Sequence, residues 1–325
     1  MPKAFISVLS FIFLFTLAAC GQDHNAPAAA NETNSDVEPA SPTEISESID
    51  ITDAAGNQLT FDQVPTSFAT FDSGVLDILL ALDANVTGRP TASGEIESSL
   101  QDITEIGNPH QPNFEIVAQV NPDVLVVPIS LQRYEETFKN QDIQPVYTQA
   151  NSITDIQDTI HTFGVLLDKK EEADKINQTI TDKINEVNHN DQAAVHTLLV
   201  YGAPGTYLAA LPNSLSGDIL EQAGGVNIAA DFPKEDNYPQ YASMSSEKII
   251  ERNPELILLI THGDPEGVKT AFQEEMNKNA TWKNLDAVKN DRVIVLPSDL
   301  FGSNPGTKIA EALEVMQDIL AEVDE

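Results

Sequence analysis

The chain of 325 residues has few basic residues and a single cysteine. It carries 51 acidic against 17 basic residues, a formal net charge of −34, so it repels polyanions and no nucleic-acid partner is expected. Because Cys20 is the only cysteine, a disulfide framework within the chain is excluded. The arginines, which grip strongly anionic ligands by paired hydrogen bonds, are also scarce: Arg89, Arg133, Arg252 and Arg292.

Long apolar runs are absent beyond the N-terminus, so no transmembrane helix is predicted in the rest of the chain. Lys3 and the apolar run 5–17 have the pattern of a signal peptide, which we place at residues 1–19. Leu17-Ala18-Ala19 before Cys20 resembles the lipobox of bacterial lipoproteins, in which the cysteine is acylated and becomes the first mature residue. We therefore predict an extracytoplasmic protein that is anchored to the cell membrane by a lipid on Cys20. The alternative is an ordinary secretory signal with an incidental cysteine.

The composition divides the remaining chain into a tether and two domains of ordinary size. Residues 20–46 are rich in Ala, Asn, Pro, Ser, Thr and acids, which predicts a disordered tether. Short β-type runs then alternate with helical patterns in residues 47–150 and again in 191–325. Apolar residues keep helical spacing over most of 151–190, which predicts a long connecting helix. The expected fold class is α/β, with two Rossmann-like lobes of mainly parallel sheet joined by a long rigid helix.

Two look-alike segments organise this pattern, Phe114 to Val127 and Ser246 to Leu259. Each has a glutamate six residues before an Asn-Pro-acid turn, and a four-residue aliphatic run follows that turn. We interpret each copy as a helix, a turn and a strand that is covered on both faces. One long-period repeat of this kind indicates two similar lobes.

A histidine lies near each copy, His110 before the first and His262 after the second. Both occupy expected loops at the carboxyl ends of strands, where open parallel sheets bind their ligands. Imidazole is a good ligand for iron, zinc and copper, and haem iron takes axial ligands from opposite faces. We expect these two histidines to face each other across a cleft. The alternative is that each is a solvated or hydrogen-bonded loop residue.

Sequence motifs of enzymes are missing: there is no Gly-x-Ser-x-Gly, P-loop or His-Glu-x-x-His pattern. We therefore do not predict an enzyme.

The chain resembles substrate-binding lipoproteins of the class whose lobes are joined by a long helix and which serve importers for siderophores, cobalamin and haem. More closely, residues 50 to 320 resemble the haem-receptor lipoproteins of the iron-regulated surface determinant (Isd) system of Gram-positive bacteria. The most specific segments run from Gly107 to Glu115 (GNPHQPNFE), Gly202 to Leu208 (GAPGTYL), Thr261 to Glu266 (THGDPE), and Trp282 through Val288 to Val293 (VKNDRV).

The resemblance implies haem as the transported ligand and His262 as an axial ligand of its iron. The family has a methionine at the position of His110, so this chain departs toward two histidine ligands, which should favour ferric haem. The resemblance also implies docking of Glu115 and Glu247 onto an ABC permease. A helix N-terminal acid favoured by the helix dipole is the structural alternative, and both can hold.

Tyr207, Met244 and Phe301 are candidate pocket residues, and core positions are the alternative for each. The expected partners are the permease, haem or another iron complex, and upstream cell-surface haem-binding proteins, with the receptor itself a monomer. Two other functions stay open. One is a ferric-siderophore receptor on the same scaffold. The other is a zinc-dependent extracellular enzyme, which would need three protein ligands and an open site.

Overall fold

Two β-sheets organise the computed structural model, which describes residues 48–92, 96–187, 194–203, 206–261, 265–278 and 282–324. The first lobe has a five-stranded sheet in the order β5-β4-β3-β8-β9, and all of its pairings are parallel. In chain order its strands are β3 (Phe68–Thr70), β4 (Val86–Arg89), β5 (Thr104–Glu105), β8 (Val124–Pro128) and β9 (Pro145–Thr148).

The second lobe has a six-stranded sheet in the order β13-β11-β10-β14-β15, with β12 beside the start of β10. Its pairings are parallel on the β14 side of β10 and antiparallel on the β11 side. The strands are β10 (His196–Ala203), β11 (Thr206–Ala210), β12 (Val226–Asn227), β13 (Tyr241–Ser243), β14 (Leu256–Ile260) and β15 (Val293–Val295). The two-lobed α/β fold class predicted from the sequence is confirmed.

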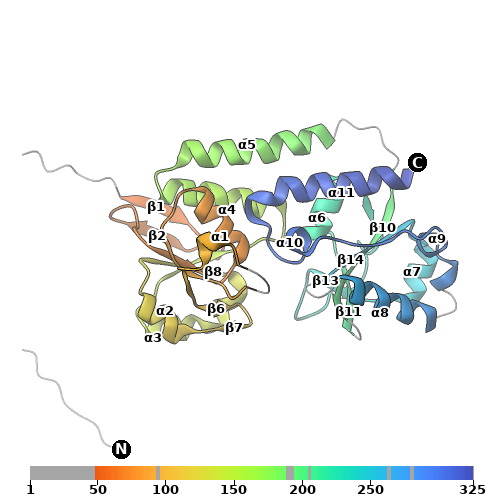
Figure 1. Ribbon diagram of the computed structural model, residues 1–325, viewed down its shortest axis with the longest axis horizontal. Coiled ribbons are helices and arrows are strands. Elements are labelled where there is room, and N and C mark those ends of the chain that lie inside the picture. Colours follow the sequence, from red (N-terminus) through yellow and green to blue (C-terminus); the bar gives the residue numbers. More distant parts are fainter. Residues whose placement is uncertain are drawn as a thin grey trace, which may run out of the picture. The chain divides into compact units, whose positions relative to one another are not determined.

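Helices cover both sheets, as Figure 1 shows. The first lobe has α1 (Ser73–Ala81), α2 (Phe114–Val120), α3 (Glu135–Asn140), α4 (Ile153–Leu166) and α5 (Lys170–Val187). The second has α6 (Leu215–Gln222), α7 (Ser246–Arg252), α8 (Pro265–Lys278), α9 (Asp286–Lys289), α10 (Ser298–Phe301) and α11 (Ile309–Asp324). Two hairpins, β1 (Ile49–Thr52) with β2 (Gln58–Phe61) and β6 (Gly107–Asn108) with β7 (Gln111–Pro112), complete the first lobe together with the 3₁₀ turns η1 (Ser98–Leu100) and η2 (Ile129–Tyr134). The second lobe adds the turns η3 (Trp282–Asn284) and η4 (Gly306–Lys308).

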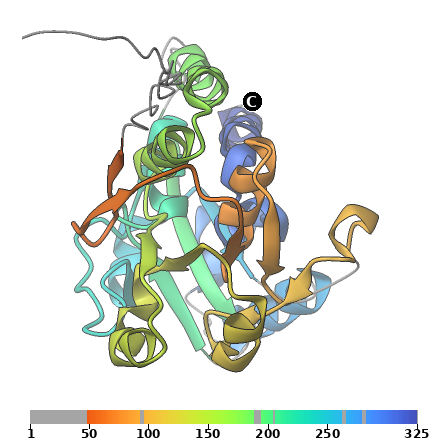
Figure 2. The same ribbon diagram turned by 90° about the vertical axis from the view of Figure 1, so that its left-hand side faces the viewer.

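The segment expected to form one connecting helix forms two helices, α4 and α5, which pack against each other (Figure 2). The chain reverses at Asp168, whose φ of 55° is left-handed, as is common where a helix ends. Gly164 permits the close approach, because a Cβ at this position would lie 2.4 Å from the Cβ of Ala173. The apolar spacing persists through the turn since both helices bury a face in the same core. Periodicity alone therefore concealed the break.

The repeated segments fold alike. Asn113 caps α2 by accepting the amide of Ile116, and Ser245 caps α7 in the same way. Both helices end on an asparagine in the left-handed region, with φ of 47° at Asn121 and 44° at Asn253. Asparagine tolerates this conformation better than most residues, which explains the shared Asn-Pro turn. The strands that follow, β8 and β14, occupy interior positions in their sheets.

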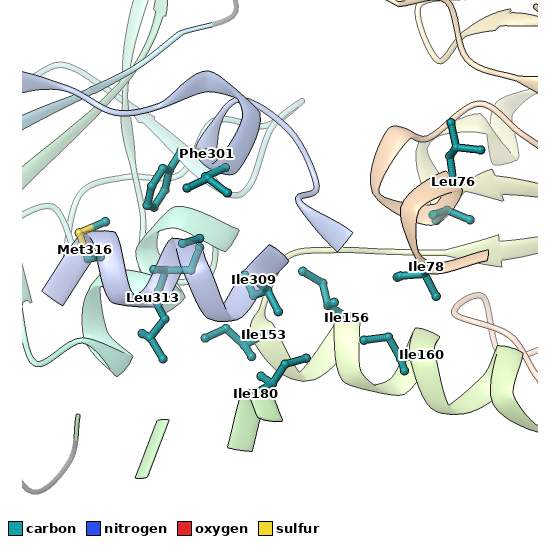
Figure 3. Packing of buried hydrophobic residues seen from close by; sticks show 14 of the residues in the cluster. Leu76, Ile78, Ile153, Ile156, Ile160, Ile180, Phe301, Ile309, Leu313 and Met316 are labelled. Atoms are coloured by element: carbon teal, nitrogen blue, oxygen red, sulfur yellow. The ribbon is translucent and has the colours of Figure 1, made fainter. Parts of the chain in front are cut away.

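A continuous apolar core joins the helices of the two lobes. Figure 3 shows side chains of this core from α1, α4, α5, α10 and α11: Leu76, Ile78, Ile153, Ile156, Ile160, Ile180, Phe301, Ile309, Leu313 and Met316. Helix α5 also lies beside α11, as Figure 1 shows. Because apolar burial is the main favourable term in folding, this core opposes separation of the lobes.

Polar contacts reinforce the junction between α1 and η4. The Oδ2 atom of Asp77 accepts the backbone N–H of Thr307 at 2.7 Å and its hydroxyl at 2.6 Å. Asn304 Nδ2 donates to Asp72 Oδ1 at 3.1 Å. Gly74 makes room for this approach, since a Cβ there would lie 2.2 Å from Cγ of Asn304. We call these four polar residues, Asp72, Asp77, Asn304 and Thr307, the α1–η4 contact.

The predicted signal peptide (1–19), the acylated Cys20 and the tether lie outside the described residues. Within the described ranges, no helix has the length and apolar character needed to cross a membrane.

Candidate functional site

A pocket of about 330 Å³ lies where the two lobes meet. The first lobe contributes the carboxyl ends of β8 and β9, and the second contributes β10, β13, the start of α6 and the segment after α10. Its lining residues are Pro128, Ile129, Ser130, Thr148, Gln149, Ala150, Asn151, Tyr201, Ser214, Leu215, Ser216, Gln240, Tyr241, Phe301, Gly302, Ser303 and Asn304. The pocket therefore occupies the strand ends where parallel sheets usually bind ligands.

Among the residues that the structure describes, this lining carries no charged side chain, although 21% of the chain is charged. Hydrogen bonds hold the side-chain amides of this lining in place. Gln149 Nε2 donates to Asp155 at 2.9 Å, and Gln240 Nε2 donates to Asn151 Oδ1 at 3.4 Å, which links the two lobes. The pocket thus offers hydroxyls, amides and aromatic surface in place of ionic partners.

Two tyrosines form an aromatic wall on the second lobe. The rings of Tyr201 and Tyr241 have centroids 4.8 Å apart and planes tilted by 33°. Burial is the main cause that raises the pKa of both phenols. A smaller electrostatic effect raises the pKa further, from Tyr238 on Tyr201 and from Tyr201 on Tyr241. At neutral pH these phenols are therefore protonated, and they present apolar faces and neutral hydroxyls to a ligand.

The start of helix α6 forms the adjoining wall. Ser214 caps the helix, with its Oγ accepting the amide of Gly217 at 3.1 Å. In the first turn, Asp218 Oδ2 accepts the amide of Ile153 at 2.7 Å, which joins α6 to the start of α4. Burial raises the pKa of the Asp218 carboxyl, although this bond opposes the shift.

His110 lies at the tip of the β6–β7 hairpin and is exposed. Asn108 Oδ1 accepts the amides of both His110 and Gln111 at 3.0 Å, which closes the tight turn. Arg133 donates to the carbonyl oxygen of Pro109 at 3.1 Å. These bonds hold the backbone beneath the imidazole while the ring stays accessible. The same Arg133 side chain donates to the carbonyl oxygen of Ser130, which lines the pocket, at 2.9 Å, so the hairpin lies beside the first-lobe wall of the pocket.

His262 lies outside the described residues, as does Cys20. The described chain approaches His262 along β14, which ends at Ile260 in the interior of its sheet. Thr261 is buried. The facing arrangement of His110 and His262 stays a prediction.

The three predicted pocket residues occupy different places. Phe301 is buried at the end of α10 and lines the pocket. Tyr207 packs edge-on against Phe272, with ring centroids 5.0 Å apart, in the core of the second lobe. Met244 packs at the margin of that core. Neither Tyr207 nor Met244 is part of the pocket lining given above, so the structure brings only Phe301 to it.

Glu115 and Glu247 are both exposed in the first turns of α2 and α7. The neighbouring Phe114 anchors α2, because its ring lies against Phe71 at 6.1 Å and against Tyr134 at 5.2 Å between centroids. These partners follow the carboxyl ends of β3 and β8.

Helix α7 is held by two hydrogen bonds to Asp231. Asp231 Oδ2 accepts a hydrogen bond from Arg252 at 2.8 Å, and the carbonyl oxygen of Asp231 accepts one from Lys248 at 3.1 Å. Both glutamates thus stand on helices with fixed positions.

The described residues contain no group of three or more His, Cys, Asp or Glu side chains arranged to hold a metal ion.

Sequence reasoning missed most of the pocket, including Gln149, Tyr201, Ser216 and Tyr241. Serines and amides carry no distinctive motif, and the strands that bring Tyr201 and Tyr241 together are separated by β11, α6 and β12 in the chain. The available signal was positional. Each of these residues lies near the end of a strand or the start of a helix that faces the lobe junction.

A two-lobed α/β chain with a pocket between the carboxyl ends of its strands has the architecture of a binding protein that encloses its ligand between lobes. Residues 69–300 match the periplasmic binding protein family, and the chain belongs to this family.

The chain is 30% identical to the high-affinity heme uptake system protein IsdE of Staphylococcus aureus over 242 residues. This alignment covers 73% of this chain and 81% of that protein. Among solved structures, an ABC transporter substrate-binding protein from Listeria monocytogenes superposes with a TM-score of 0.71 and 30% identity, over 80% of this chain and 100% of that chain. S. aureus IsdE complexed with heme gives a TM-score of 0.68 and 27% identity, over 78% and 98%.

Proposed function

We propose that this protein is an extracytoplasmic, lipid-anchored receptor that binds haem between its two lobes and delivers it to an ABC permease for iron uptake. The supporting observation is the 30% identity to a haem uptake protein across 81% of that protein's length. The fold adds support, because the chain matches the haem-complexed relative over 98% of that relative's length. The role is binding and delivery, and no catalytic step is assigned.

In this proposal His110 and His262 are the axial ligands of ferric haem. The hairpin supports His110 as a ligand, since Asn108 and Arg133 hold its backbone and leave the imidazole exposed. Two imidazoles impose a strong axial field, which makes the bound iron six-coordinate and low-spin, and the absence of a thioether ligand favours the ferric state.

The charge-free lining argues against the siderophore alternative. A ferric catecholate complex carries several negative charges, and burying them without cationic partners is unfavourable. Among the described residues, no Lys or Arg lines the pocket. A tetrapyrrole presents a broad uncharged face that suits aromatic and neutral polar surfaces such as Tyr201, Tyr241 and Phe301.

The test is a titration of the mature chain with ferric haem, followed by the Soret band. We expect a stoichiometric complex with a low-spin spectrum. His110→Ala and His262→Ala should abolish this low-spin species. His161→Ala, which removes an exposed histidine of helix α4, is the matched control and should bind as the wild type does. A high-spin spectrum that His110→Ala leaves unchanged would refute ligation by His110.

The permease contacts proposed for Glu115 and Glu247 rest on their exposure in equivalent first turns of α2 and α7. Charge reversal of both to Lys should reduce haem-dependent growth while haem affinity stays unchanged. The control is reversal of Glu172 and Glu311, which are exposed on α5 and α11. Normal uptake by the Glu115/Glu247 double variant would remove the docking proposal.

The lipid anchor is tested separately. Cys20→Ala should release the protein from the membrane fraction. Retention of the variant in membranes would contradict acylation of this cysteine. The receptor is further proposed to act as a monomer that receives haem from upstream cell-surface haem-binding proteins.

A further inference from the structure

The β6–β7 hairpin that carries His110 is weakly supported by its own strands. These strands form a two-stranded sheet that is separate from the five-stranded sheet of the lobe. An isolated two-stranded hairpin is only marginally stable in water. Its base is fixed, because the carbonyl oxygen of Gly107 accepts the amide of Thr91 at 2.8 Å. The position of the tip therefore depends on contacts that reach it from another element.

One arginine joins this tip to the wall of the pocket. Arg133 Nη2 donates to the carbonyl oxygen of Pro109 at 3.1 Å, and Nη1 donates to that of Ser130 at 2.9 Å. Pro109 directly precedes His110, and Ser130 lines the pocket. Among the described residues, no other hydrogen bond joins residues 108–112 to a different element. Because the guanidinium is planar and rigid, its two bonds fix the tip relative to the wall.

Arg133 is itself held by the core of the first lobe. Its guanidinium carbon lies 4.9 Å from the centroid of the Tyr134 ring. That ring packs against Phe114 with centroids 5.2 Å apart, and Phe114 packs edge-on against the buried Phe138 at 5.4 Å. A chain of ring contacts thus leads from the core to the guanidinium, and the guanidinium passes the position of η2 on to the hairpin.

We propose that Arg133 is a positioning residue for haem, which holds His110 against the first-lobe wall so that the imidazole and the pocket engage one ligand together. This inference rests on the proposed haem-receptor function and adds to it a residue that acts through His110. Groups that orient a metal-binding side chain contribute about 10–100-fold to metal affinity. Arg133 is exposed, so water compensates part of its loss and the lower end of this range applies.

The test is a titration of the whole mature chain with ferric haem, in which the Soret band gives the Kd and the visible spectrum gives the spin state. Arg133→Ala should raise the Kd by about 10-fold and convert part of the low-spin complex to high-spin, because the released hairpin lets His110 leave the iron. Arg133→Lys keeps the charge but cannot make the two bonds in a fixed geometry, so it should lose nearly as much. Arg252→Ala is the matched control, since it breaks an exposed arginine bond to Asp231 on α7 and should bind as the wild type does.

Two comparisons separate positioning from direct contact with the ligand. In a His110→Ala chain, which still offers His262 to the iron, adding Arg133→Ala should change the Kd by less than about 2-fold, because the residue has no ligand left to position. In the chain that keeps His110, Arg133→Ala should weaken haem dimethyl ester, whose propionates are neutralised, by the same factor of about 10 as haem.

The outcomes that overturn the positioning role are distinct from those that overturn the function. Equal losses with and without His110 would point to general damage or direct contact. A loss seen with haem but not with its ester would assign Arg133 to a propionate, and full recovery in Arg133→Lys would show that only its charge matters. Each of these results, or an Arg133→Ala chain with unchanged Kd and spin state, would overturn the positioning role and leave haem binding intact. A wild-type chain without a Soret band would overturn the haem-receptor function, and the role of Arg133 with it.

Discussion

The α1–η4 contact makes a sharp prediction about how the lobes are held together. Asp77 lies on α1 of the first lobe, and its Oδ2 atom accepts two hydrogen bonds from Thr307, which belongs to the turn before α11. Asp77→Ala removes both bonds and the negative charge at the start of that turn. The truncated side chain also leaves the Thr307 amide without its partner.

The magnitude follows from the two bonds. Hydrogen bonds to charged groups contribute about 1.5–3 kcal/mol each, but Asp77 and Thr307 are half-buried, so water compensates part of the loss. We expect a net decrease of about 2–3 kcal/mol in the free energy of unfolding. For a chain of this size, whose entropy of unfolding is about 0.6 kcal/mol/K, that lowers the unfolding midpoint by roughly 3–5 °C. Asp77→Asn keeps an acceptor and should lose about half as much.

Thermal unfolding followed by circular dichroism measures the effect, with Asp318→Ala on the exposed face of α11 as the control. A double-mutant cycle with Thr307→Ala isolates the pair, and its coupling energy should exceed about 1 kcal/mol. Equal unfolding midpoints for Asp77→Ala and Asp318→Ala would contradict this prediction. So would a double variant whose loss of stability equals the sum of the two single losses.

Three further changes test the local arguments. Burial raises the pKa of Asp72 above its ordinary value of 3.8. The folded chain therefore binds this proton more tightly than the unfolded chain does, which stabilises the fold at low pH. This contribution to the free energy of unfolding is lost as pH rises through the raised pKa. Asp72→Asn should therefore raise the unfolding midpoint at pH 7, and the gain should vanish as pH falls below 3.8. Gly74→Ala should lower the midpoint although alanine favours helices, because its Cβ would lie 2.2 Å from Cγ of Asn304; an increase would contradict this packing. Asn253→Ala removes two hydrogen bonds with Asp286 and leaves alanine at a φ of 44°, so it should cost about 2–3 kcal/mol by urea unfolding; Asn253→Gly loses the bonds without the backbone strain and should cost less.

The sequence predicted those features of the fold that depend on local pattern. The repeated helix, Asn-Pro turn and strand formed as expected because capping, a left-handed asparagine and a buried aliphatic run all act within about 15 residues. The connecting segment was harder. Helical spacing continues across α4 and α5, and the reversal depends on Asp168 and on the fit of Gly164 to Ala173, which becomes visible only when the two helices meet.

The candidate site shows the same division. Phe301 is predicted from a position in a loop on the cleft side, and it lines the pocket. Tyr207 was chosen by the same reasoning, but its position on β11 turns it toward Phe272 in the core. Strand residues alternate between two faces, so a displacement of one position exchanges pocket for core.

The repeated unit also places the proposed docking residues and the pocket on one side of the molecule. A helix that returns through a tight turn into a strand runs antiparallel to it, so the start of the helix lies at the carboxyl end of the strand. The contacts of Phe114 show this for α2, since its ring meets Phe71 and Tyr134 beyond the ends of β3 and β8. In the second lobe, α7 begins three residues after β13, whose Tyr241 lines the pocket. The proposed docking residues Glu115 and Glu247 therefore stand on the edge that carries the pocket. A permease that engages both would meet the ligand at the same surface.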